Sequence, residues 1–133
     1  MDMHPSPDTA PYELIGGDAR VRAIVDRFYD LMDEVPEYYC VRKLHPADLS
    51  GSRDKLYMFL SGWLGGPQLY VEKFGHPMLR ARHLPFPIGS AERDAWSACM
   101  TQAMEECQVE EKLRDWLVQS LSGTADWMRN RNG

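Results

Sequence analysis

The chain has 133 residues, of which 44% are hydrophobic and 26% are charged, and its formal net charge is −5. This length and balance predict one compact domain with its own hydrophobic core, and they exclude wholesale disorder. The negative charge argues against a protein that binds nucleic acid or an anionic membrane surface.

Features that would direct the chain to a membrane or out of the cell are not found in the sequence. No window approaches eighteen consecutive apolar residues, so no membrane-spanning helix is expected. The three cysteines form no CxxC pair, which fits a reducing compartment, and we expect a cytoplasmic protein. Residues 1–11 carry three prolines and no signal-peptide pattern, so we expect a flexible tail ahead of a domain over residues 12–133.

The first long helix is predicted between Gly17 and Pro36. Asp18 is a suitable N-cap, and apolar residues then recur at helical spacing over four turns: Val21, Ile24, Val25, Phe28, Leu31, Met32 and Val35. Residues 37–43 are expected to form a short helix before His45-Pro46. Ser50 begins the next helix, which the Gly65-Gly66-Pro67 turn ends.

The second half of the chain predicts one broken helix and two regular ones. Residues 68–82 read as helix interrupted at Gly75-His76-Pro77, and the proline-rich run over residues 84–87 cannot be helical. Ser90 is expected to cap a helix that carries Cys99 and Cys107 on its apolar face, and a last helix covers about residues 109–128. No convincing period-2 run is found, so the fold class is all-α.

His83 is the residue that most clearly suggests chemistry, because the chain has no P-loop, GxGxxG, HExxH or GxSxG motif. It follows the broken helix, where an imidazole can donate one ring N–H to an unsatisfied carbonyl and offer the other nitrogen to a metal. A haem site needs such a ligand, with cations for the propionates and apolar walls. Neighbouring residues of both types are available: Arg80, Arg82, Leu84, Phe86 and Ile88. The residues alone favour a histidine that only satisfies the helix end.

Five runs of sequence resemble the group II truncated haemoglobins, in the order and at the intervals of that family, and the match extends from Tyr12 to about Trp127. The runs are residues 27–29 (RFY), 63–67 (WLGGP), 75–77 (GHP), 80–88 (RARHLPFPI) and 92–96 (ERDAW). The resemblance implies a two-over-two helical sandwich around haem b. It also implies that the broken segment before His83 replaces a regular helix.

The resemblance assigns roles to single residues. His83 matches the proximal iron ligand, and the hydroxyl of Tyr29 and the indole N–H of Trp96 match donors to the bound ligand. Ser52 and Leu56 match distal-helix positions that face the ligand, and a small residue such as Ser52 suggests an open side route to the iron. We also expect Phe59 to contact haem, together with the arginines and apolar residues around His83.

His45 falls where the family often has Phe or Tyr and in some members His. Its ring can donate to the ligand, accept from a neighbour, or approach the iron itself in the ferric state. The residues alone also allow a histidine that only ends a short helix.

The function implied by the resemblance is reversible binding of dioxygen, carbon monoxide and nitric oxide, for oxygen transport or storage. The alternative is a haem enzyme, either a peroxidase or a nitric oxide dioxygenase, which would need an external reductase because the chain has no flavin or nicotinamide domain. A sensor would need an output domain, and a helical interaction module without haem is the remaining alternative. We expect a monomer or a homodimer.

Overall fold

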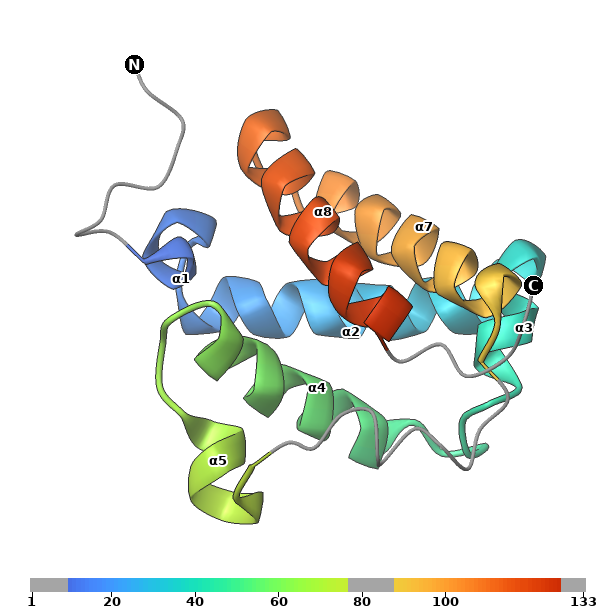
Figure 1. Cartoon of the computed structure of the whole chain (residues 1–133), viewed down its shortest axis with the longest axis horizontal. Helices are drawn as coiled ribbons and strands as arrows, with labels where there is room; N and C mark the ends of the chain where they lie inside the picture. The colour runs from blue at the N-terminus through green and yellow to red at the C-terminus, as the bar shows by residue number, and fades with distance from the viewer. Residues whose placement is uncertain (1–9, 77–87, 128–133) are drawn as a thin grey trace.

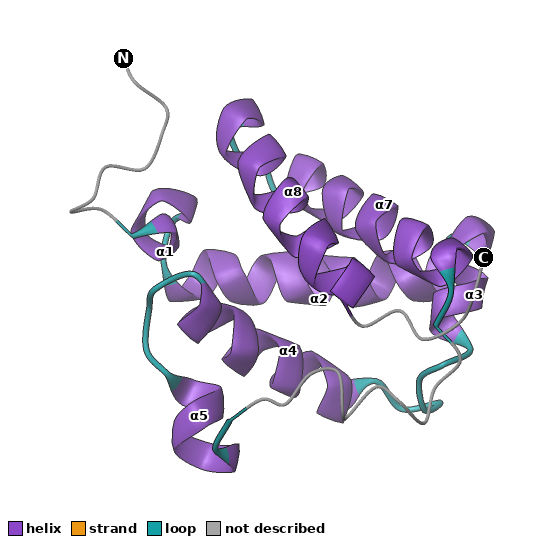
Figure 2. Cartoon of the chain, viewed as in Figure 1, coloured by secondary structure: helices purple, strands orange, loops and turns teal. Residues whose placement is uncertain are grey.

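A computed structural model describes residues 10–76 and 88–127. These residues form helices and no strand, which confirms the all-α prediction (Figure 2). The helices are α1 (Pro11–Ile15), α2 (Asp18–Glu34), the 3₁₀ helix η1 (Pro36–Tyr38), α3 (Tyr39–Arg42), α4 (Ser50–Trp63), α5 (Leu69–Phe74), α7 (Ser90–Glu106) and α8 (Glu111–Trp127). In this described part, none of the helices has the length and apolar character needed to cross a bilayer.

The four long helices are arranged as two pairs. α7 and α8 pack against each other, α2 packs against α7 on one side and α4 on the other, and α5 extends from α4 (Figure 1). Connections of few residues join most of the helices, so neighbours in sequence are also neighbours in space. This arrangement leaves α2 in the middle, with side chains that can reach both α4 and α7.

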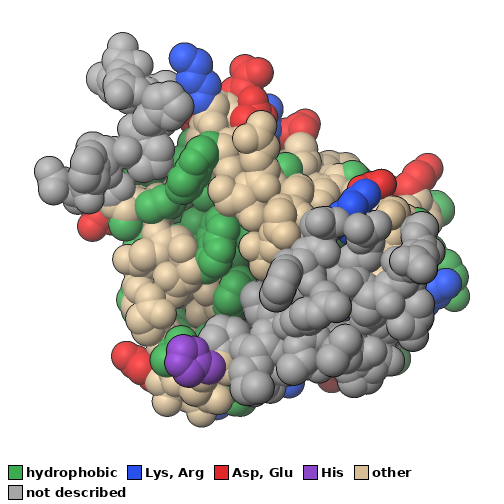
Figure 3. All heavy atoms as spheres, in the orientation of Figure 1, with side chains coloured by type: hydrophobic (Ala, Val, Ile, Leu, Met, Phe, Trp, Pro, Cys, Tyr) green, Lys and Arg blue, Asp and Glu red, His purple; other side chains and the backbone are tan. Residues whose placement is uncertain are grey.

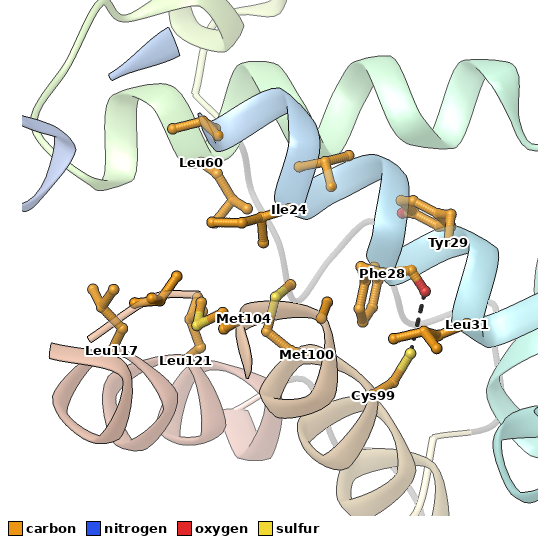
Figure 4. Close-up of a cluster of buried hydrophobic side chains, with 14 of the residues drawn as sticks. Ile24, Phe28, Tyr29, Leu31, Leu60, Cys99, Met100, Met104, Leu117 and Leu121 are labelled. Carbon is orange, nitrogen blue, oxygen red and sulfur yellow. Dashed lines mark hydrogen bonds between the residues drawn. The ribbon is translucent and has the colours of Figure 1, made fainter. Parts of the chain in front are cut away.

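The core lies where α2, α7 and α8 meet. The apolar stripe predicted on α2 is buried, including Ile24, Val25 and Phe28, each at most 2% exposed. Figure 4 shows Phe28 and Leu31 of α2 turned toward the residues of α7. The buried residues of α7 and α8 that complete the core are Cys99, Met100, Ala103, Met104, Leu113, Leu117 and Leu121. Burying side chains of this size contributes about 1.5–3 kcal/mol each, so this cluster is the main stabilising element.

Two predicted helix caps are each displaced by one residue. Asp18 and Ser90 were expected as N-caps, but they are the first helical residues, and the N-caps are Gly17 and Gly89. Gly17 has φ +79°, a conformation that glycine adopts without strain, and this frees the Asp18 carboxylate to accept a hydrogen bond from the Tyr57 hydroxyl. At α7 the Glu92 carboxylate accepts the Gly89 N–H at 2.9 Å.

Helix α1 was not predicted from the sequence, because it has five residues and only Ile15 is buried. Its position depends on contacts with the end of α4, where the Tyr12 N–H donates to the Leu64 carbonyl at 2.9 Å. The Tyr12 ring also covers Gly66 so closely that a Cβ there would lie 2.4 Å from a ring carbon. The division at residue 11 between tail and domain stays a prediction, since residues 1–9 lie outside the described part.

Candidate functional site

Tyr29 is the most deeply buried polar aromatic residue of the predicted distal site. It lies on α2, is 5% exposed, and packs its ring edge-on against Phe28 with 5.0 Å between ring centroids. Burial raises the pKa of the phenol well above its ordinary value, and the nearby Arg53 charge acts in the opposite direction. Its hydroxyl makes no hydrogen bond within the described part of the chain, so it is a neutral donor available to a ligand.

His45 follows α3 and lies beside Tyr29, with 5.7 Å between the ring centroids and the rings nearly perpendicular. Its Nδ1 is 2.9 Å from the Val41 carbonyl oxygen. A carbonyl can only accept, so Nδ1 carries a proton, and the neutral ring then has its acceptor at Nε2. The structure therefore brings His45 and Tyr29 together, as the sequence predicted.

Trp96 reaches the same region from α7. Its ring packs edge-on against Phe28 with 5.3 Å between centroids, so Phe28 contacts both Tyr29 and Trp96. The indole is half-buried, and among the described residues its N–H has no hydrogen-bond partner. Two donors from different helices are thus joined through one buried ring, although 67 residues separate Tyr29 from Trp96 in the sequence.

The helix α4 supplies the remaining predicted distal residues. Ser52, Leu56 and Phe59 are all half-buried, and Leu56 and Phe59 pack against the core. The Phe59 ring contacts Tyr70 of α5 at 6.5 Å between centroids. It also lines an open hollow of about 230 Å³, together with Trp63 and other residues of α4, α5 and the turn between them. Hydrophobic side chains form a band on one face of the molecule (Figure 3).

Comparison with known proteins identifies the family. The family model described as bacterial-like globin matches residues 10–130. The chain belongs to the bacterial-like globin family. The group 2 truncated hemoglobin of Bacillus subtilis is 43% identical to this globin over 122 residues, which cover 92% of the chain and 89% of that relative.

Solved structures agree with this assignment. The group II 2-on-2 hemoglobin from the plant pathogen Agrobacterium tumefaciens has 51% sequence identity and a TM-score of 0.90, over 98% of this globin and 100% of that chain. The truncated oxygen-avid haemoglobin from Bacillus subtilis has 43% identity and a TM-score of 0.83, over 92% and 100%. The predicted resemblance to group II truncated haemoglobins and the two-over-two fold are both confirmed.

Membership in the globin family implies a haem cofactor. The described residues fit such a group on its distal side, because two hydrogen-bond donors that have no partner among these residues lie among apolar and aromatic walls. The predicted proximal residues Arg80, Arg82, His83, Leu84 and Phe86 lie outside the described part of this globin. Ile88 is described, and it is half-buried just before α7.

Cys99 lies on the buried, apolar face of α7, as the apolar spacing in the sequence predicted. It is fully buried, and its thiol donates to the Phe28 carbonyl at 3.2 Å (Figure 4). Burial raises the pKa of this thiol to about 12, so the reactive thiolate is suppressed. The second cysteine on that face, Cys107, is only half-buried.

Sequence reasoning missed Arg53, which contacts the site residue Tyr29. Its guanidinium carbon lies 5.9 Å from the centroid of the Tyr29 ring, and its NH2 group donates to Asp30 at 2.7 Å. A signal was present in the sequence: Asp18, Arg22, Asp26 and Asp30 recur every four residues and therefore share one edge of α2. This charged edge indicates ion pairs with a neighbouring helix, but it does not identify which helix.

Proposed function

We propose that this globin binds haem b, with His83 as the iron ligand, and that it holds dioxygen and other diatomic ligands reversibly. The observation that supports the proposal is the pair of donors, Tyr29 and Trp96, which contact the same Phe28 ring and have no hydrogen-bond partner in the described residues. A solved relative is titled oxygen-avid, which agrees with strong ligand retention. Haem supplies an iron at which a diatomic ligand binds.

The residues of the chain decide how long the ligand stays. A dioxygen ligand carries partial negative charge, so it accepts hydrogen bonds from the Tyr29 hydroxyl and the Trp96 indole. Each hydrogen bond contributes on the order of 1 kcal/mol, and more where the acceptor is charged. The ring of Phe28 contacts both donors, and Leu56 of α4 packs against the same core. Slow dissociation of dioxygen follows from this arrangement.

Absorption spectra of the purified protein test this proposal. We expect a Soret band that shifts when the ferric protein is reduced with dithionite and shifts again when carbon monoxide is added. The variant His83→Gly should lose this band or bind haem far more weakly, whereas His76→Gly, at an exposed turn, should keep the wild-type spectra. A reconstituted wild-type protein without a Soret band would contradict the proposal.

The second candidate is a haem enzyme, because the same donors also stabilise charge that develops when an O–O bond breaks. We therefore propose measuring peroxide-dependent oxidation of a dye, and loss of nitric oxide from the dioxygen complex with an external reductant. Turnover that falls in both Tyr29→Phe and Trp96→Phe would favour the enzyme. Turnover no faster than that of free haem would leave reversible binding as the function.

A further inference from the structure

A seam of polar contacts joins α2 to α4 along one edge. The side chains that recur every four residues on α2 meet partners on α4 in antiparallel order: Asp18 with Tyr57, Arg22 with Asp54, and Asp26 and Asp30 with Arg53. We call these residues the α2–α4 seam. Because successive residues along α2 pair with successive positions along α4, the seam fixes how the two helices are aligned along their lengths.

Arg53 is the most strongly held residue of the seam. One nitrogen of its guanidinium donates to the Asp26 backbone carbonyl at 2.9 Å and to the Asp26 carboxylate at 3.3 Å, and the other donates to Asp30 at 2.7 Å. Its side chain is 23% exposed, the lowest value among the paired charges of the seam. Burial opposes its charge, but the contacts with Asp30 and Asp26 outweigh burial and raise its pKa. Arg53 is thus a permanent cation.

The partners of Arg53 bracket Tyr29. Asp30 is the next residue along α2, and Asp26 lies one turn before Tyr29. The ion pairs of Arg53 therefore hold the turn of helix that carries the phenol. The guanidinium also lies over the Tyr29 ring at 5.9 Å, within the range of a cation–π interaction. On α4, Arg53 directly follows Ser52 and precedes Leu56 by one turn.

We infer that Arg53 is a positioning residue that acts through Tyr29: it sets the direction of the Tyr29 hydroxyl and so controls how fast a diatomic ligand leaves. The part of the inference that concerns ligand release rests on the proposed function. The hydrogen bonds of Arg53 to Asp26 and Asp30 on α2 do not depend on that function. A lysine at this position keeps the charge but cannot donate to the Asp26 carbonyl and the Asp30 carboxylate with a planar fork. A neutral residue at position 53 loses the ion pairs with Asp26 and Asp30 and also the cation–π contact with the Tyr29 ring.

Arg22 provides a matched control in the same seam. It makes ion pairs of the same kind, with Asp26 at 3.4 Å and with Asp54 at 2.9 Å, and its guanidinium lies over Tyr57 at 5.3 Å. It is seven residues from Tyr29 on α2, and among the described residues its guanidinium lies over Tyr57 rather than over Tyr29. Any effect of losing one seam arginine on stability alone should appear in Arg22→Gln as well.

The test compares Arg53→Gln, Arg53→Lys and Arg22→Gln in the holoprotein, each with and without Tyr29→Phe. The measurements are the dioxygen dissociation rate, the C–O stretching frequency of the carbon monoxide complex, and the thermal midpoint. The Tyr29 ring signal in ¹³C-tyrosine-labelled protein, assigned by its loss in Tyr29→Phe, adds a readout that needs no gas ligand.

We expect Arg53→Gln to raise the dioxygen dissociation rate about two- to tenfold, as loss of one well-directed hydrogen bond would. The C–O frequency should rise and the Tyr29 ring signal should shift, with partial recovery in Arg53→Lys. Arg22→Gln should change the rate by less than about twofold even if its thermal midpoint falls equally. In the Tyr29→Phe background, Arg53→Gln should no longer change the rate.

Two results would overturn the inference. One is an equal effect of Arg53→Gln with and without the Tyr29 hydroxyl, and the other is an equal effect of Arg53→Gln and Arg22→Gln on rate and ring signal. Either result in a protein with normal haem spectra leaves the proposed function intact. Failure of the wild-type protein to bind haem would instead contradict the proposed function, and the inference with it.

Discussion

Replacing Tyr29 by Phe removes one oxygen atom from a residue that is only 5% exposed. The hydroxyl makes no hydrogen bond in the described part of the chain, so its removal leaves none of the described groups unpaired. We therefore expect the free energy of unfolding of the haem-free protein to change by less than about 0.5 kcal/mol, or to rise slightly. The ligand, in contrast, loses one of its hydrogen-bond donors.

The loss at the ligand is expected to be near the upper end for a hydrogen bond, about 1.5 kcal/mol, because the Tyr29 ring is enclosed and water cannot readily replace the hydroxyl. That value corresponds to about a tenfold faster dissociation of dioxygen. Stopped-flow mixing of the dioxygen complex with carbon monoxide measures this rate, and chemical denaturation measures the stability.

Tyr38→Phe is the control with the opposite expectation. The Tyr38 hydroxyl donates to the Gln102 side-chain oxygen at 2.7 Å and so already has a protein partner, and its loss should cost about 1 kcal/mol of stability and leave the dioxygen rate unchanged. If Tyr29→Phe destabilised the fold as Tyr38→Phe does and left the dissociation rate unchanged, the hydroxyl would serve packing rather than ligand binding.

Four further outcomes are expected. Gly66→Ala should destabilise by about 1–3 kcal/mol in thermal unfolding because its Cβ meets the Tyr12 ring at 2.4 Å, whereas Gly123→Ala, with open space around it, should not. Because burial raises the pKa of Tyr29 above the unfolded value near 10, stability should fall as pH rises past about 10, and less steeply in Tyr29→Phe. Ser52→Phe should slow bimolecular carbon monoxide binding in flash photolysis, and an unchanged rate would refute the side route. His45→Leu should slow dioxygen release, because the neutral His45 ring presents an acceptor at Nε2 that competes with the ligand for the Tyr29 hydroxyl, and faster release would contradict this.

The long helices could be predicted from the sequence because their burial follows one period. Apolar residues at helical spacing define α2, α4, α7 and α8, and Pro36 and the turn after Trp63 end two of them where expected. The last helix was expected from about residue 109 but begins at Glu111, since Gln108 adopts φ +62° and turns the chain first. Helix α1 was missed because its stability comes from contacts with residues about fifty positions away, which no local pattern reports.

The site, too, could be predicted only in part from the sequence. The spacing of Tyr29, His45 and Trp96 carries no signal by itself, and only the resemblance to a family assigned them to one place. Trp96 is linked to Tyr29 through Phe28 because α2 crosses α7 at that residue, and His45 contacts Tyr29 because the chain after α3 turns back toward α2. Arg53 was predicted neither from residue spacing nor from the family resemblance. It lies in none of the runs that carry the resemblance, and only the packing of α4 on α2 identifies its partners.

Tyr29 is a buried residue whose hydroxyl makes no hydrogen bond in the described part of the chain. Phe at position 29 would fill nearly the same volume beside Phe28, so the hydroxyl is not needed to fill the core. The same turn of α2 nevertheless receives three hydrogen bonds from Arg53, which hold the backbone and side chains on both sides of Tyr29. Rigid support around a donor that has no partner among the described residues is the arrangement expected where the partner comes from outside the protein. A ligand that supplies the missing acceptor would therefore bind to a donor whose direction is already fixed, with little further loss of side-chain freedom.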